Sequence, residues 1–344
     1  MRLVFTRSFC LVILILLSFY SRHALSQDTK IMGFVDVLST YKNDKLSFSF
    51  GEQDLFITSE LTDKISFLGE TVFKFDPESN TDFSISVERV IIRYNLKGNH
   101  YLVLGKHHTP LNYWNETYHH GRVFSPNIFR PLVFQDFMIP LHTTGIGFQG
   151  TNLTKINLGY DLLVGNGIGS GDLEDNDKYK SITASVHIKP YDGLRLGVSY
   201  YNDVISEGVV NHHGPDHEME GITEKITQQI FTGSFSFFKK KVELLAEGTF
   251  VNNTSDSLGS QNSMGLYAHA GYRIHPKIIP YVRYDNVDYA ENDMWFHAST
   301  RQSFIGGMRY EFSYLAVLKA EYQYNDLKSG SDTDSITLQF AIGF

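Results

Sequence analysis

Histidine and acidic side chains are concentrated in two segments of the chain, and both segments could bind a metal ion. The later segment reads His212-His213-Gly214-Pro215-Asp216-His217-Glu218. Imidazole and carboxylate groups this close together are the ligands of zinc and copper sites. One interpretation is therefore a metal site at His212, His213, Asp216 and His217. The alternative is a solvated polar loop, which is the commoner outcome for so polar a sequence.

The earlier segment, residues 108–141, combines imidazole, indole and guanidinium groups. Its candidate constriction residues are Trp114, Glu116, His119, His120, Arg122 and Arg130. Such a set suits a narrow passage for ions, a metal site, or plain packing of a loop with water. Because adjacent side chains of an extended chain diverge, a metal shared by His119 and His120 would need help from Glu116 or Asp136.

Charged residues also recur at alternate positions of segments whose other positions are mostly apolar. They include Arg195, Glu243, Arg273, Arg283, Arg309, Glu311, Lys319 and Glu321. If these segments cross a membrane as strands, their charged side chains cannot face lipid, because a basic side chain near the middle of a bilayer costs about 2–4 kcal/mol. The charged residues then imply a hydrated interior. We interpret them as pore-lining residues that bias which ions pass. The alternative is that these residues form cross-strand ion pairs that are only part of the wall.

No combination of residues indicates catalysis. His142-Thr143-Thr144 places a histidine near hydroxyl groups, but no Gly-x-Ser-x-Gly elbow or other strong nucleophile motif occurs. We therefore expect a protein that is not an enzyme, with no catalytic residues and no cofactor. An outer-membrane barrel enzyme and a closed structural or adhesion barrel are the alternatives.

The elements that carry these residues have a period of two, which indicates β-strands. In the last segment, Ile336, Leu338, Phe340 and Ile342 occupy every second position. Comparable runs cover roughly residues 30–41, 46–60, 64–76, 82–95, 99–107, 142–151, 155–165, 179–190, 193–205, 224–237, 240–252, 262–274, 278–290, 299–312, 314–327 and 334–344. They predict an all-β fold, a transmembrane antiparallel β-barrel of about 16 strands.

The connections between these runs alternate in length, which separates a barrel from a soluble sandwich. Tight turns such as Lys97-Gly98 and Lys239-Lys240 alternate with longer polar segments such as 166–178 and 206–223. Short turns at one end and long loops at the other are typical of an outer-membrane barrel with both termini in the periplasm. The longest connection, 108–141, is then the third extracellular loop. We also expect an aromatic belt at the periplasmic rim, made of Tyr272, Tyr281, Phe312, Tyr314 and Phe344.

Composition and the N-terminus indicate export to the outer membrane of a Gram-negative cell. Aromatic residues make up 14% of the chain while the mean hydropathy is only −0.20, as expected where strand faces alternate between lipid and water. Residues 1–26 combine arginines, an apolar run and Ala24-Leu25-Ser26 in the order of a signal peptide, which leaves 27–344 as the barrel. Loss of their three arginines shifts the net charge from −8 to −11, so nucleic acid is not an expected partner.

The mature chain resembles the general porins in its termini, its strand rhythm and the position of its third loop, and Phe344 matches the assembly signal of such barrels. Leu104-Gly105-Lys106-His107-His108-Thr109-Pro110 and Thr144-Gly145-Ile146-Gly147-Phe148 also resemble the porin O and P family and its Bacteroidota relatives. The resemblance implies passive diffusion of small hydrophilic solutes or ions through a lumen that the third loop narrows. It also implies outer-membrane lipids and the barrel-assembly machinery as partners, and a homotrimer as one arrangement.

Overall fold

The structure is a computed structural model that describes residues 28–344, except 77–82, 172–173, 212–220, 297–298 and 329. The expected signal peptide lies outside the described residues. So do His212, His213, Asp216 and His217. Among the described residues, no helix has the length and apolar character needed to cross a bilayer.

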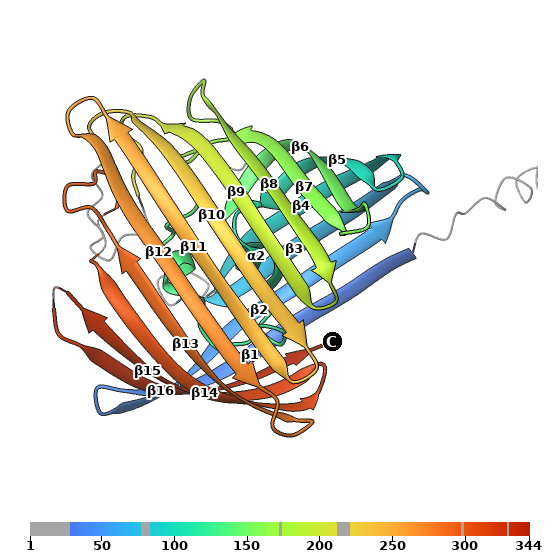
Figure 1. Cartoon of the computed structure of the whole chain (residues 1–344), viewed down its shortest axis with the longest axis vertical. Helices are drawn as coiled ribbons and strands as arrows, with labels where there is room; N and C mark the ends of the chain where they lie inside the picture. Colours follow the sequence, from blue (N-terminus) through green and yellow to red (C-terminus); the bar gives the residue numbers. More distant parts are fainter. Residues whose placement is uncertain (1–27, 77–82, 172–173, 212–220, 297–298, 329) are drawn as a thin grey trace, which may run out of the picture.

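In the described part of the chain, 16 antiparallel strands form a closed barrel, as the sequence predicts (Figure 1). Each strand pairs with its neighbours in sequence, and β1 closes the barrel against β16. The first eight are β1 (Asp28–Lys42), β2 (Lys45–Glu60), β3 (Ile65–Phe75), β4 (Phe83–Lys97), β5 (His100–His108), β6 (His142–Leu153), β7 (Leu158–Asn166) and β8 (Lys180–Tyr191). The others are β9 (Leu194–Ile205), β10 (Ile226–Lys239), β11 (Val242–Ser255), β12 (Gly259–Tyr272), β13 (Ile278–Asp288), β14 (Arg301–Ser313), β15 (Ala316–Leu327) and β16 (Thr333–Gly343).

The two faces of the barrel wall have opposite chemistry. In β16, Ile336 and Leu338 are exposed on the outer face, whereas Thr337 and Gln339 are buried on the inner face. In β15, Lys319 points inward and is fully buried. A sheet of a water-soluble protein keeps its apolar face inside, whereas this wall has its apolar face outside. The wall is therefore suited to contact with the hydrocarbon of a membrane. The alternation in the sequence predicts the strands but does not say which face is outside.

Strands β11 and β12 extend further than the apolar pattern predicts. The predicted runs end at 252 and begin again at 262, whereas the two strands pair as far as Ser255 and Gly259. The added positions are polar on both faces, and next to them Asn252 donates a side-chain hydrogen bond to Asn262 at 2.7 Å. Backbone pairing therefore continues beyond the part of the wall that carries apolar side chains, and the connection shortens to 256–258.

The two ends of the barrel differ in their connections. At the end that holds both the start of β1 and the end of β16, the connections are 61–64, 98–99, 154–157, 192–193, 240–241, 273–277 and 314–315. At the opposite end they are 43–44, 76–82, 109–141, 167–179, 206–225, 256–258, 289–300 and 328–332. The predicted alternation of short and long connections is present. Two connections at the long-loop end, 43–44 and 256–258, are tight turns.

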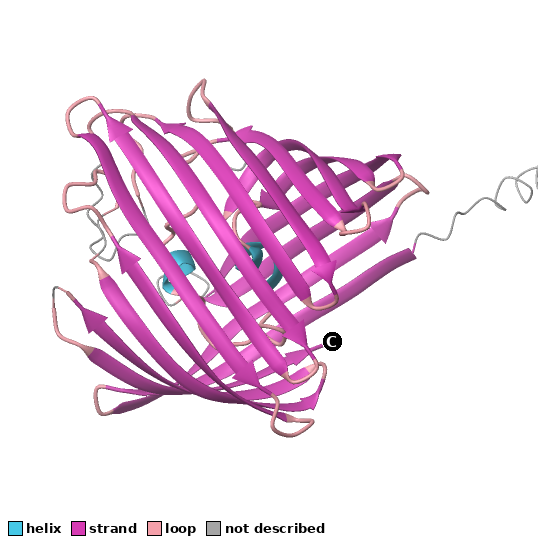
Figure 2. Cartoon of the chain, viewed as in Figure 1, coloured by secondary structure: helices cyan, strands magenta, loops and turns pink. Residues whose placement is uncertain are grey.

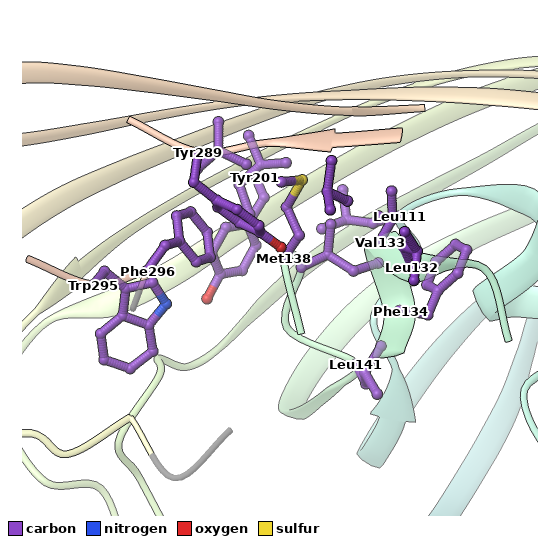
Figure 3. Packing of buried hydrophobic residues seen from close by; sticks show 14 of the residues in the cluster. Leu111, Leu132, Val133, Phe134, Met138, Leu141, Tyr201, Tyr289, Trp295 and Phe296 are labelled. Atoms are coloured by element: carbon purple, nitrogen blue, oxygen red, sulfur yellow. The ribbon is translucent and has the colours of Figure 1, made fainter. Parts of the chain in front are cut away.

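Residues 109–141, here called the lumen segment, lie inside the barrel and contain the short helices α2 (Tyr113–Tyr118) and α3 (Leu132–Gln135) (Figure 2). One side of the lumen segment packs against inward-facing apolar residues of β9–β13. Leu132, Phe134 and Met138 form a continuous buried cluster with Tyr201 and with Tyr289 of the 289–300 connection (Figure 3). This half of the barrel interior is therefore a packed apolar core.

The aromatic-belt prediction is wrong for Tyr281. Its neighbour Val282 is exposed on the outer face, so Tyr281 points inward, where it is 4% exposed. Its hydroxyl donates a hydrogen bond to Glu321 Oε1 at 2.8 Å. The other predicted members are exposed, namely Tyr272, Phe312, Tyr314 and Phe344. Their position at a membrane interface stays a prediction.

Candidate functional site: the lumen segment and its wall contacts

The base of the lumen segment is closed by hydrogen bonds between its two ends. The backbone N–H of Thr109 donates to the carbonyl of Leu141 at 2.9 Å. The side-chain amide of Asn115, in α2, donates to the carbonyls of Thr109 and Leu141 at 2.9 and 3.1 Å. A buried amide that binds both ends in this way holds α2 in a fixed position above the junction of β5 and β6.

The carboxylate of Glu247, on the barrel wall, binds the N-terminal end of α2. The backbone N–H groups of Tyr113 and Trp114 donate to Glu247 of β11, and the hydroxyl of Tyr267 donates to the same carboxylate. The first N–H groups of a helix have no partner within the helix, so a carboxylate there satisfies them. Trp114 is buried and stacks on Phe134, with ring centroids 4.7 Å apart. Trp114 therefore packs within the apolar core instead of facing open space.

Three of the cations predicted to line the pore bind backbone carbonyls of the lumen segment. Lys319 donates to the carbonyls of Arg122 and Asn127 at 2.6 and 3.1 Å. Arg283 donates to the carbonyl of Phe129 at 2.7 Å, and Arg309 donates to that of Pro126 at 3.4 Å. These side chains face the interior but are covered by the lumen segment. Their role in lining a pore stays a prediction.

Apart from Arg195, the remaining predicted pore-lining residues fall into two groups on the same part of the wall. Arg273 and Arg309 form a network with Glu311 at 2.6 and 3.0 Å, and Arg309 also reaches Glu243 at 2.7 Å. Glu321 accepts a hydrogen bond from the backbone N–H of Ile128 at 2.8 Å. Four of the predicted residues are thus joined in one ion-pair network, and Glu321 fastens the lumen segment.

Arg195 and Glu116 connect the opposite side of α2 to the wall. The guanidinium of Arg195 donates to Glu116 Oε2 at 2.8 Å and lies over the ring of Tyr113 at 4.8 Å. Burial of the carboxyl group raises the pKa of Glu116 to about 7, and the attraction of Arg195 offsets part of this effect. The sequence placed Arg195 in the wall and Glu116 in the constriction but did not pair them.

Arg122 and Arg130 meet a carboxylate that the sequence did not single out. Arg122 pairs with Glu52 of β2 at 2.9 Å, and Arg130 lies 3.9 Å from the same carboxylate. Arg130 also lies over the ring of Trp114 at 5.9 Å. The basic residues of the lumen segment therefore face acidic residues on β2, which is the wall across from the apolar core.

The expected help of Glu116 or Asp136 in a histidine metal site is wrong. Glu116 is paired with Arg195, and Asp136 accepts a hydrogen bond from Tyr289 at 3.0 Å. His119 has helical backbone angles, φ −46° and ψ −49°, so the premise of an extended chain at His119-His120 does not hold. Both imidazoles point toward β5 and β6, where they meet His108 and His142.

A β-bulge in β4 explains why sequence reasoning missed Glu88. Glu70 pairs with Arg89 and Thr71 pairs with Val87, which leaves Glu88 as an extra residue on β4. A bulge shifts the alternation by one position. Ser86 and Glu88 therefore face inward before the shift, and Arg89 faces inward after it. A strict period of two would have placed either Glu88 or Arg89 in lipid.

Two cavities of the lumen lie beside strands β3–β7. One cavity of about 440 Å³ is lined by Lys74, Glu88, Lys106, Arg130 and His142 among others. A second, of about 400 Å³, is lined by Glu60, Arg89, Arg93, Glu116 and Asp161 among others. Charges of both signs surround both cavities. The lumen segment thus fills one half of the barrel and leaves polar cavities along the other.

Solved structures of outer-membrane channels have the same fold. An anion-selective porin from Comamonas acidovorans matches with a TM-score of 0.67 at 12% identity, over 93% of this chain and 100% of that chain. The outer membrane channel DcaP of Acinetobacter baumannii matches with a TM-score of 0.63 at 13% identity, over 93% and 98%. OmpF of Salmonella typhi, in complex with daunomycin, matches with a TM-score of 0.65 at 10% identity, over 92% and 97%. The chain matches no protein-family model and no curated protein sequence.

Proposed function

We propose that this protein is an outer-membrane channel for passive diffusion of small hydrophilic solutes or ions, and that the lumen segment sets the width of the passage. The observation that carries the proposal is an inverted barrel whose interior keeps polar cavities beside β3–β7. The names of the similar solved structures, an anion-selective porin and an outer membrane channel, support it. The resemblance to the porin O and P family remains a prediction within this proposal.

Selection in such a channel would depend on size and charge. Lys74, Arg130 and Glu88 line one cavity, and Arg89 and Asp161 line the other, so permeating ions would meet both signs. Fixed charges in a narrow passage with a low local dielectric act strongly on ions. We infer diffusion without catalysis and without a cofactor.

The proposed location follows from the same features. Residues 1–26 would direct export and be removed, and both termini would lie in the periplasm. The exposed apolar side chains on the outer face of the barrel would contact outer-membrane lipids. Phe344 would serve the barrel-assembly machinery. A homotrimer is the proposed assembly, supported by the trimer form of OmpT from Vibrio cholerae, which matches with a TM-score of 0.64 at 11% identity over 92% of this chain and 99% of that chain.

A closed structural or adhesion barrel is the second candidate, because the lumen segment packs tightly against β9–β13. Single-channel recording in planar bilayers separates the two. A channel gives discrete conductance steps, and the reversal potential under a salt gradient gives its charge selectivity. Absence of steps from correctly folded protein would favour the closed barrel.

A further inference from the structure

Four imidazoles meet where the lumen segment returns to the wall. His108, the last residue of β5, pairs with His142, the first residue of β6, and His119 and His120 directly follow α2. One nitrogen atom from each of the four lies within 4.8 Å of the others. The ring centroids of His108 and His119 are 4.3 Å apart, and those of His119 and His142 are 4.8 Å apart. Three separate elements therefore direct imidazoles to one point.

The side chains of His108, His119 and His120 are buried, and that of His142 is 21% exposed. His119 and His120 are each 2% exposed. Both ring nitrogens of His108 have no hydrogen-bond partner among the described residues, and the Nε2 atoms of His120 and His142 face the carboxylate of Glu88. A buried polar atom without a partner costs about 1–3 kcal/mol, so two on one ring indicate a missing partner.

Neighbouring residues fix which nitrogen of His119 and His120 carries the proton. The amide hydrogens of Asn115 are donated to two carbonyls, so its Oδ1, 2.7 Å from His119 Nδ1, must accept. His120 Nδ1 lies 3.1 Å from Glu52 Oε2 and donates to it. His119 therefore presents the lone pair of Nε2 to the cluster, and His120 does so when its imidazole is neutral. Metal-binding histidines are oriented in this way by a hydrogen bond on their other nitrogen.

A carboxylate completes the cluster. Glu88 Oε2 lies 2.8 Å from His142 Nε2 and 3.1 Å from His120 Nε2. Arg122 and Arg89 are paired with other carboxylates, Glu52 and Glu70. Glu88 is thus placed to neutralise part of a positive charge at the centre of the imidazoles.

We propose that His108, His119, His120 and His142 bind a divalent transition-metal ion of the zinc class, with Glu88 at its edge. Imidazole ligands favour zinc, copper, nickel or iron over calcium and magnesium, which prefer oxygen. Zinc binds four ligands in a tetrahedron at about 2.0–2.1 Å from nitrogen, so small rotations of the four side chains bring their nitrogens to the ion.

The ion would tie the end of α2 to the wall at the junction of β5 and β6. The apolar core and the wall cations hold the lumen segment from the opposite side, where Lys319 and Arg283 bind it. The metal would therefore fix the edge of the lumen segment that borders the open cavities. The site itself does not depend on whether the barrel conducts ions.

The test measures zinc binding by the whole mature barrel, purified in detergent and stripped with a chelator. All variants carry His212→Ala, His213→Ala and His217→Ala, because these histidines could bind zinc independently. Isothermal titration calorimetry should give one zinc per chain in this background. His119→Gln and His142→Gln should each weaken binding more than about 100-fold, beyond the effect of losing a residue that only orients a ligand. His275→Gln, at an exposed turn, is the matched control and should bind normally.

Either of two results overturns the proposal: no stoichiometric zinc in the background protein, or unchanged affinity in both His119→Gln and His142→Gln. A second measurement uses no ligand variant, so misfolding of a variant cannot affect its result. X-ray absorption of the zinc-loaded background protein should show a first shell of nitrogen ligands with imidazole scattering. A first shell made mainly of oxygen would also overturn it.

Discussion

The Nζ atom of Lys319, on β15, lies 2.6 Å from the backbone carbonyl oxygen of Arg122 in the lumen segment. Lys319 is fully buried and also donates to the carbonyl of Asn127 at 3.1 Å. Burial of an ammonium group is costly unless other acceptors replace water, and these carbonyls do so. The lysine and the lumen segment therefore stabilise each other: the carbonyls keep the cation in the interior, and the cation holds the chain against β15.

Replacing Lys319 by methionine should lower the free energy of unfolding by about 1–3 kcal/mol, because the two carbonyls stay buried and lose their donor. Methionine keeps most of the side-chain volume, so the loss reports the hydrogen bonds. The measurement is the midpoint of urea unfolding in lipid vesicles. Lys328→Met is the control and should leave the midpoint unchanged, because Lys328 is exposed. Equal midpoints for both variants would mean that Lys319 does not fasten the lumen segment.

Stability should depend on pH through Glu116. Burial raises the pKa of Glu116 from 4.5 to about 7 in the folded protein. The folded state then holds this proton more tightly than the unfolded state, so its contribution to stability is greatest below about pH 4.5 and falls as pH rises to about 7. Glu116→Gln should flatten the dependence of the unfolding midpoint on pH between these values, whereas exposed Glu207→Gln should not. An unchanged slope in Glu116→Gln would contradict the raised pKa.

The strands and their number could be predicted from the sequence because each strand alternates between two environments. In β16, a single period of two from Ile336 to Ile342 identifies the strand. The apolar pattern did not predict the strand ends where the backbone still pairs but the side chains on both faces are polar. β11 and β12 continue pairing through Asn253 and Thr254, where both faces are polar and no alternation is visible.

The contacts of the lumen segment could not be predicted from the sequence, because they join residues that are distant in the chain. Arg195 with Glu116, and Lys319 with the carbonyl of Arg122, depend on the path of residues 109–141 through the interior. Every residue has a backbone carbonyl, so the sequence does not show which carbonyls a cation binds. A cation of the wall that binds carbonyls therefore occupies the same alternate strand positions as a cation that faces water. Glu88 was hidden for another reason, since its bulge breaks the period of two.

The orientation of the barrel can be tested with single cysteines. The connection 206–225 lies at the long-loop end of the barrel, and 240–241 lies at the end with the termini. If the long-loop end faces outward, Asp216→Cys should react on intact cells with a thiol reagent that does not cross the membrane, and Lys240→Cys should react only after the cells are opened. Both should react equally in purified protein in detergent. Equal labelling of the two on intact cells would refute the orientation.

Shortening the lumen segment is the sharpest test of the channel proposal. Replacing residues 114–128 with a short Gly-Ser linker removes most of α2, His119, His120 and Arg122, and it uncovers Lys319 and Glu321 on the wall. The closed ladder of β-strands does not include these residues, so the barrel should still assemble. Conductance should rise because the interior is less filled, and charge selectivity should weaken because fixed charges lie farther from the ion path. Planar-bilayer recordings and reversal potentials of parent and deletion, after both pass a heat-modifiability test of folding, give the comparison. Equal conductance in both would show that the lumen segment does not set the passage, and silence in both would leave the closed barrel as the better account.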